Sequence, residues 1–229
     1  EWPRFSSSGS EDENRAVISV LQGDGLREIF FQLGINKVID GGQSMNPSTN
    51  SFLEAINDLN QEEIIIFPNN SNVISAAKQA ASMSDKEVIV VPTNSIAENI
   101  SALMVNDPQK KLSELKKDME AEIEQVKTLK FTEAVKNSSV NNMDIKKGDI
   151  LGLCEDEIMI KGENLKNVVI DLLTKVRDQE DLITLYTGKN MDEGEVKEII
   201  ETIRAKCSIE EIEDYYGGQI MYPLIISLE

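Results

Sequence analysis

Residues 64–91 have the sequence IIIFPNNSNVISAAKQAASMSDKEVIVV and contain the clearest secondary-structure pattern of the chain. Two apolar, mostly β-branched runs, 64–67 and 88–91, enclose a segment in which the apolar residues between 73 and 81 recur at helical spacing. Short continuous apolar runs are typical of parallel strands buried on both faces, and a helix is the usual connection between two of them. The stretch therefore predicts a strand, a helix and a second strand of a parallel sheet.

The same alternation continues on both sides of this stretch. Further apolar runs and helical stripes occupy 16–21, 26–33, 38–39, 52–59 and 96–104. Residues 14–107 are therefore predicted to form a four-stranded parallel α/β lobe. Residues 1–13, EWPRFSSSGSEDE, show no periodicity, and we interpret them as a linker or an expression remnant.

The pattern changes after residue 107. Asp107-Pro108 predicts a helix start, because proline is tolerated in the first turn, and an apolar stripe then predicts a connecting helix over 108–125. Tight polar turns between short apolar segments favour antiparallel pairing beyond it. Strands are expected at 128–135, 143–160, 182–186, 209–214 and 223–228, and helices at 165–176 and 193–205. The second lobe, 126–229, is thus predicted to be a mixed α/β sandwich.

The composition is that of a folded protein with a strongly acidic surface. Hydrophobic residues make up 40% of the chain and charged residues 28%, and 41 acidic against 23 basic side chains give a net charge of −18. Such a charge disfavours nucleic-acid and anionic-lipid partners, and the simplest interpretation is that it keeps the protein soluble. No apolar run approaches the ~20 residues of a membrane span. With two separated cysteines, a reducing, cytoplasmic location is expected.

The chain has no histidine, which excludes Ser-His-Asp and Cys-His catalysis and His-ligated zinc. It also contains no Walker-type phosphate loop and no concentrated acidic set that would hold magnesium and ATP. No cofactor or metal is therefore expected in this chain. Asp24, between two glycines after the first strand, either orients a ligand or shapes the turn.

Polar side chains follow three strands of the predicted parallel sheet. In such sheets ligands bind at the carboxyl ends of the strands, near helix N-termini that offer free N–H groups. A polar rim that binds a ligand or a partner is therefore one hypothesis; helix capping and turn formation are the alternatives for individual residues. The candidate residues are Gly42, Gln43, Ser44, Asn46, Ser48, Thr49, Asn69, Asn70, Asn72 and Thr93.

Several segments in order also resemble one known family. The segments are LQGDGLREIFFQLG (21–34), VIDGGQSMNPSTNSFLEAI (38–56), IIIFPNNSNVISAAKQAA (64–81), VIVVPTNSIAENISAL (88–103) and the terminal YYGGQIMYPLIISLE (215–229). Together they resemble the carboxy-terminal region of bacterial fatty acid kinase A subunits of the YloV-like type, and the last segment is similar to that family's natural chain end.

The resemblance implies a three-part parent protein. Its amino-terminal domain, similar to the L subunit of dihydroxyacetone kinases, would hold ATP and magnesium, and it would phosphorylate a fatty acid presented by an acyl-binding B subunit for phospholipid synthesis. The present chain would be a non-catalytic domain that recognises the acyl-loaded B subunit. It would not itself be an enzyme.

A second likeness concerns the layout of the first lobe. The loop at 41–49 and the following PNNSN segment are similar in position to the two loops with which DegV-type proteins hold an acyl carboxylate. Asparagines stand here where that family has a serine-rich loop, and no histidine is present. A DegV-like fold is therefore expected, and a module that binds a fatty acid or a small carboxylate is the alternative function.

Overall fold

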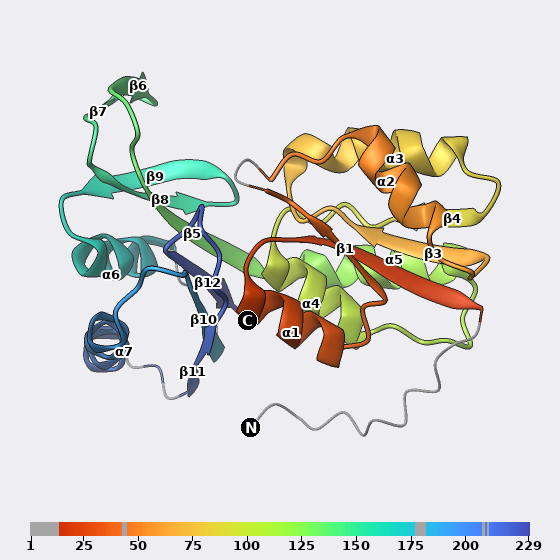
Figure 1. Ribbon diagram of the computed structural model, residues 1–229. Helices are drawn as coiled ribbons and strands as arrows, with labels where there is room; N and C mark the ends of the chain where they lie inside the picture. The colour runs from red at the N-terminus through yellow and green to blue at the C-terminus, as the bar shows by residue number, and fades with distance from the viewer. Residues whose placement is uncertain (1–13, 43–44, 177–181, 208, 210) are drawn as a thin grey trace. The chain divides into compact units, whose positions relative to one another are not determined.

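The computed structural model describes residues 14–42, 45–176, 182–207, 209 and 211–229. The chain forms two compact units, and the division falls between Gln125 and Val126 (Figure 1). Each unit has a sheet of its own, four-stranded in the first and six-stranded in the second.

The first unit alternates strands with helices. Its elements are β1 (Arg15–Leu21), α1 (Asp24–Gln32), β2 (Lys37–Asp40), α2 (Thr49–Asn57), β3 (Glu63–Phe67), the 3-10 turn η1 (Ser71–Val73), α3 (Ile74–Met83), β4 (Glu87–Val90), α4 (Ile96–Met104) and α5 (Leu112–Ile123). The strand order is β2-β1-β3-β4 and every pair is parallel, which confirms the predicted parallel sheet.

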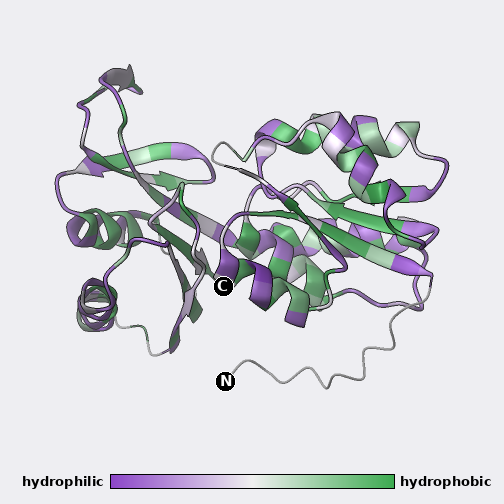
Figure 2. Ribbon diagram, viewed as in Figure 1, coloured by the Kyte–Doolittle hydropathy of each residue, from purple (hydrophilic) through white to green (hydrophobic). Residues whose placement is uncertain are grey.

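The central strands explain the apolar runs of the sequence. All of β1 and residues 64–67 of β3 are buried. Figure 1 shows α2 and α3 on one face of this sheet and α1 and α4 on the other, so neither central strand has a solvent side. In Figure 2 the strands are accordingly hydrophobic over most of their length, whereas the helices carry hydrophilic residues on their outer faces.

The helix expected from Asp107-Pro108 begins later, at Leu112. The buried Arg15 side chain donates to the carbonyl oxygens of Asp107 at 3.0 Å and Lys110 at 2.7 Å. Residue 109 also donates its N–H to the Asp107 carboxylate at 2.9 Å, which closes a turn. These contacts explain why a turn precedes the helix. Once formed, α5 packs against α4 and β4, so it belongs to the first unit.

The second unit is built on a mixed sheet. Its elements are β5 (Lys127–Glu133), β6 (Ser138–Val140), β7 (Met143–Ile145), β8 (Ile150–Cys154), β9 (Glu157–Gly162), α6 (Leu165–Val176), β10 (Leu182–Thr187), α7 (Glu193–Cys207), β11 (Glu211–Tyr216) and β12 (Leu224–Leu228). The order is β11-β10-β12-β5-β8-β9; only β10 and β11 are parallel, and β6 pairs with β7 in a separate two-stranded sheet. This confirms the mixed α/β class predicted for the second lobe.

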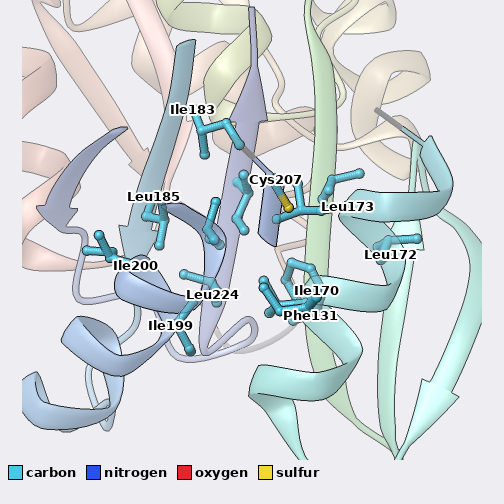
Figure 3. Packing of buried hydrophobic residues seen from close by; sticks show 14 of the residues in the cluster. Phe131, Ile170, Leu172, Leu173, Ile183, Leu185, Ile199, Ile200, Cys207 and Leu224 are labelled. Atoms are coloured by element: carbon cyan, nitrogen blue, oxygen red, sulfur yellow. The ribbon is translucent and has the colours of Figure 1, made fainter. Parts of the chain in front are cut away.

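Helices α6 and α7 cover one face of the six-stranded sheet with an apolar core (Figure 3). Alternate residues of β5, Leu129 and Phe131, point into this core and are fully buried, as are Leu173 from α6 and Ile199 from α7. Burial of each such side chain contributes about 1.5–3 kcal/mol of transfer free energy.

The segment expected as strands over 143–160 contains β7, β8 and β9, with turns at the two predicted places. Gly148 (φ 94°) lies in the first turn, and Glu155 and Asp156 (φ 47° and 66°) form the second. Strand β6 was not predicted, because Val140 is its one apolar residue and all three of its residues are exposed.

Candidate functional site

The candidate site lies in the first unit, at the edge where its four parallel strands end. The segments that follow β1, β2, β3 and β4 each lead into a helix, and the described candidate residues lie in these segments or in the first turn of the helix that follows. Parallel strands bring their carboxyl ends to one edge of the sheet, so these segments lie in the same part of the unit.

Asn69 is buried and makes the most hydrogen bonds of the candidate residues that the structure describes. Its side-chain Nδ2 donates to Ser19 Oγ at 2.9 Å and to the Val20 carbonyl at 3.0 Å. The Thr93 hydroxyl donates to Asn69 Oδ1 at 2.8 Å and accepts the Asn69 backbone N–H at 3.1 Å. Both amide hydrogens and the amide oxygen are thus used within the protein.

Asn99 extends this buried network to α4. Its Nδ2 donates to Ser19 Oγ at 2.7 Å, and its Oδ1 has no partner within the described residues. The network therefore joins β1, the segments after β3 and β4, and α4. Asn69 holds a left-handed backbone (φ 55°), which asparagine tolerates better than most residues. Asn69 and Thr93 consequently stabilise the strand ends from inside.

Ser19 and Asn99 were not predicted from the sequence, although each carries a signal. Ser19 is the one hydroxyl residue in the apolar run 16–21, and Asn99 lies in α4, whose residues 96–102 are all buried. A polar side chain within a run that is otherwise buried must find an internal partner.

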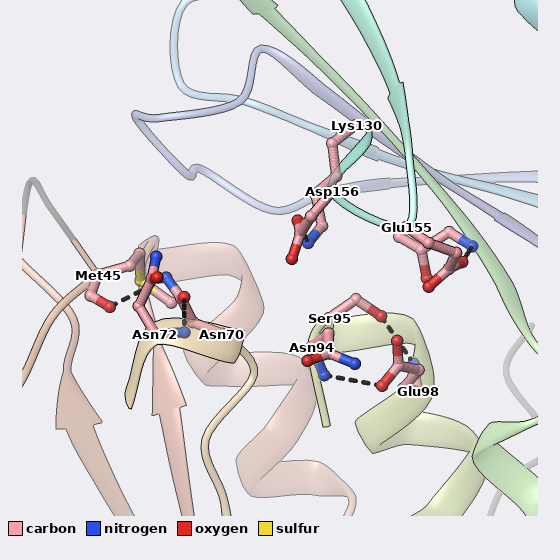
Figure 4. A network of polar contacts seen from close by, with 10 residues as sticks. Met45, Asn70, Asn72, Asn94, Ser95, Glu98, Lys130, Glu155 and Asp156 are labelled. Atoms are coloured by element: carbon pink, nitrogen blue, oxygen red, sulfur yellow. Dashed lines mark hydrogen bonds and ion pairs between the residues drawn. The ribbon is translucent and has the colours of Figure 1, made fainter. Parts of the chain in front are cut away.

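Asn70 connects the segment after β3 with the segment after β2. Its Nδ2 donates to the Met45 carbonyl at 3.1 Å, and its Oδ1 accepts the N–H of Asn72 at 2.9 Å, which caps η1 (Figure 4). The Asn70 side chain is half-buried, and Asn46 and Asn72 are exposed. Asn70 is thus both a structural link and partly accessible to a partner.

Ser48 and Thr49 serve helix α2. Ser48 is its N-cap and accepts the N–H of Ser51 at 3.2 Å, which is the capping alternative foreseen from the sequence. The Thr49 hydroxyl donates to Gln79 Oε1 at 3.1 Å and so links α2 to α3.

The remaining candidates lie at the ends of β1 and β2. Asp24 is exposed and is the first residue of α1. Gly42 is exposed; its N–H binds the Asp40 carboxylate at 2.8 Å, and its carbonyl accepts from Gln22 Nε2 at 2.5 Å. Gln43 and Ser44 lie outside the described residues.

A capping box at the start of α4 was also not predicted. Ser95 accepts the N–H of Glu98 at 3.1 Å, and the Glu98 carboxylate accepts the N–H of Asn94 at 2.7 Å (Figure 4). The Ser-x-x-Glu spacing was the signal for this motif. Ser95 and Glu98 are buried, so the box is part of the interior of the unit.

The YYGGQ segment (215–219) of the second unit contains the last two residues of β11 and the tight loop that follows the strand. The N–H groups of Gly217 and Gly218 bind the Thr187 carbonyl at 2.9 and 3.0 Å, and Gln219 Nε2 donates to the Tyr186 carbonyl at 2.7 Å. Tyr215 stacks on Tyr186 with ring centroids 6.3 Å apart. Burial raises the pKa of Tyr186 above its ordinary value. This segment therefore ties the end of β10 to the end of β11 through hydrogen bonds and has a structural role.

The described part of the chain holds no group of acidic, histidine or cysteine side chains that could bind a metal ion. Over the same residues, no helix is long and apolar enough to cross a membrane.

The family model of FakA-like C-terminal domains, which are those of fatty acid kinase subunits of the A-like type, matches residues 16–229. An uncharacterized protein of Staphylococcus epidermidis is 33% identical over 225 residues, covering 98% of this chain and 41% of the relative. Protein YloV of Bacillus subtilis is 33% identical over 214 residues, covering 93% of this chain and 39% of the relative. The chain thus spans roughly two fifths of the curated relatives it matches.

Solved structures of the DegV family share the fold. A DegV family protein of Corynebacterium glutamicum superposes with a TM-score of 0.66 at 14% identity, covering 96% of this chain and 97% of that protein. The fatty acid kinase B3 protein of Streptococcus pneumoniae, solved with linoleic acid, gives a TM-score of 0.61 at 13% identity, covering 94% and 99%. The predicted DegV-like layout is therefore confirmed at the level of the fold.

Proposed function

Because the chain belongs to the family of FakA-like C-terminal domains of fatty acid kinases, we propose that it is the part of such a kinase that recognises the acyl-loaded B subunit. Phosphate transfer from ATP would take place in another part of the parent protein. The acyl phosphate formed in the cytoplasm would then supply phospholipid synthesis.

The observation that carries this proposal is the family match over 16–229 in a chain that spans 41% of one relative and 39% of another. A large part of those relatives lies outside this region and has room for a nucleotide-binding domain. The sequence of the present chain contains no phosphate loop and no histidine for catalysis. A role in recognition is consistent with both facts.

The geometry of the strand ends also supports recognition by surface groups. Asn69 and Thr93 use their polar groups inside the protein, whereas Asn46 and Asn72 are exposed and Asn70 is half-buried. The accessible asparagines therefore stand on a base that internal hydrogen bonds hold rigid. Because their positions are already fixed, binding a protein partner costs less conformational entropy.

Calorimetric titration of the purified chain with a fatty-acid-loaded B protein from the same organism tests the proposal. We expect binding to the loaded protein, weaker binding to the lipid-free protein, and no ATP hydrolysis by the chain alone. Asn70→Ala should weaken binding, with Asn57→Ala, an exposed change at the end of α2, as the control. Absence of binding to the loaded protein, or ATP turnover by this chain, would contradict the proposal.

The fold likeness to the linoleic-acid-loaded B3 protein favours one second candidate, a module that itself binds a fatty acid or a small carboxylate. The strand-end residues Asn69 and Thr93 are buried and bonded to each other, so their groups are not open to a carboxylate. Native mass spectrometry of the protein as purified distinguishes the two functions. A co-purifying fatty acid supports the second candidate, and a ligand-free mass supports recognition.

A further inference from the structure

Residues 134–149, called the arm below, leave the six-stranded sheet after β5 and return to it at β8 (Figure 1). The arm carries β6 and β7 as a separate two-stranded sheet. Every residue from 135 to 142 is exposed, and Val135 has 82% and Val140 36% of its surface accessible. Exposed valines contribute little to folding, so the core of the second unit does not explain this element.

The base of the arm is nevertheless tightly fixed. Ala134 and Asp149 are joined by a backbone hydrogen bond of 2.8 Å, and the Asp149 carboxylate accepts from the Lys146 N–H at 2.9 Å and from Lys161 Nζ at 2.8 Å. These contacts hold the pKa of Asp149 below its ordinary value. Beneath them, Ala134, Ile145 and Leu151 form a small buried cluster.

The tip of the arm is also preorganised. Asn141 and Asn142 have φ values of 50° and 61°, the left-handed pair that a two-residue hairpin turn requires and that asparagine tolerates. A fixed base and a defined turn keep the exposed residues in one arrangement, which reduces the ordering cost of a contact.

The charge of the arm differs from that of the whole chain. Lys136, Lys146 and Lys147 are exposed, and none of them forms an ion pair with a residue in the described ranges. The arm's acidic residues are Asp144 and Asp149, and Asp149 is already paired with Lys161. Lys146 still helps to lower the pKa of the Asp149 carboxylate at longer range, so Lys136 and Lys147 are the cations that most clearly point to carboxylates on another molecule.

We propose that the arm docks on an acidic, partly apolar face of the acyl-loaded B subunit, with the lysines meeting carboxylates and the valines supplying apolar contact. This inference rests on the function proposed above. A membrane is the less favoured occupant, because the arm has no aromatic side chain and only two exposed apolar ones, Val135 and Val140, which gives it little to insert among lipid headgroups.

The test compares two triple variants with the same change in net charge. Lys136→Glu, Lys146→Glu and Lys147→Glu reverse the arm, and Lys189→Glu, Lys197→Glu and Lys206→Glu reverse three exposed lysines elsewhere in the second unit. Calorimetric titration with the loaded B protein should show binding weakened about tenfold or more by the arm variant. The control variant should bind like the wild type, and circular dichroism should show both variants folded.

Three other outcomes would contradict the inference, and they show whether the proposed function fails with it. If the wild type binds and the two variants weaken binding equally or not at all, the arm is not the contact and the proposed function stands. If the wild type does not bind, the proposed function and the inference both fail. If the wild type sediments with phosphatidylcholine–phosphatidylglycerol (7:3) vesicles and the arm variant does not, the arm binds membranes and protein docking is wrong.

Discussion

The buried network of the first unit and the arm of the second unit place their polar side chains in opposite ways. In the first unit, Asn69, Thr93, Ser19 and Asn99 turn inward and bind one another beneath the strand ends. In the second unit the sheet and helices share an apolar core, and the arm carries polar and basic residues outward. Polar residues at the ends of strands can therefore be part of the fold, whereas an exposed arm with a fixed base points to a partner.

The largest effect is expected in the core of the second unit. Leu173→Ala removes a fully buried side chain from the contact between α6 and the sheet, and it should lower the free energy of unfolding by about 2–5 kcal/mol. Urea unfolding followed by circular dichroism measures this change. Ile220→Ala, at a residue 56% exposed, is the control and should change it by less than about 0.5 kcal/mol.

The buried network of the first unit should be nearly as sensitive. Asn69→Ala removes the side-chain bonds to Ser19, Val20 and Thr93 and leaves the buried Thr93 hydroxyl without its acceptor, so it should cost about 2–4 kcal/mol in the same unfolding measurement. Asn69→Gly should cost about 1 kcal/mol less, because glycine adopts the left-handed backbone without strain. An Asn69→Ala protein as stable as the wild type would mean that the network does not hold the strand ends.

A smaller loss is expected at the start of α4. Ser95→Ala removes the cap of the Glu98 N–H and should lower the free energy of unfolding by about 1 kcal/mol. Ser75→Ala, at an exposed position inside α3, is the matched change and should have almost no effect. Equal effects at the two serines would contradict the capping role.

The smallest effect on stability is expected in the arm. Val135→Ser changes a side chain that is 82% exposed, so the free energy of unfolding should stay within about 0.5 kcal/mol of the wild type. The same variant should weaken binding of the loaded B protein, because an apolar contact is lost. Marked destabilisation would show that the arm serves the fold and would remove the contrast between the two units.

The sequence was sufficient for the architecture because both central strands of the first sheet are covered on two faces. That burial produces the apolar runs 16–21 and 64–67, and these predicted the parallel order of strand and helix correctly. The late start of α5 was not predictable, because the carbonyl of Lys110 is bound by Arg15, 95 residues away in the sequence. Strand β6 gave no apolar signal, since it is exposed throughout.

The position of the candidate site at the strand ends was predictable from the sequence, but the direction in which its side chains point was not. The position of polar residues after the strands follows from strand and helix spacing alone. Whether Asn69 faces inward depends on Ser19, 50 residues away, and the position of Ser19 depends in turn on Asn99, 80 residues away. Local patterns contain no information on such pairings, and the roles of Asp24, Asn46 and Asn72 in binding stay predictions.

Hydrogen–deuterium exchange of the chain, with and without the acyl-loaded B protein, would show which residues that protein covers. If the chain recognises that protein through outward-facing groups, exchange should slow at residues 135–147 of the arm and at residues 70–72, and it should stay unchanged in β1 and α4, which hold Ser19 and Asn99. Unchanged exchange in the arm, together with slower exchange in β1 and α4, would contradict the account.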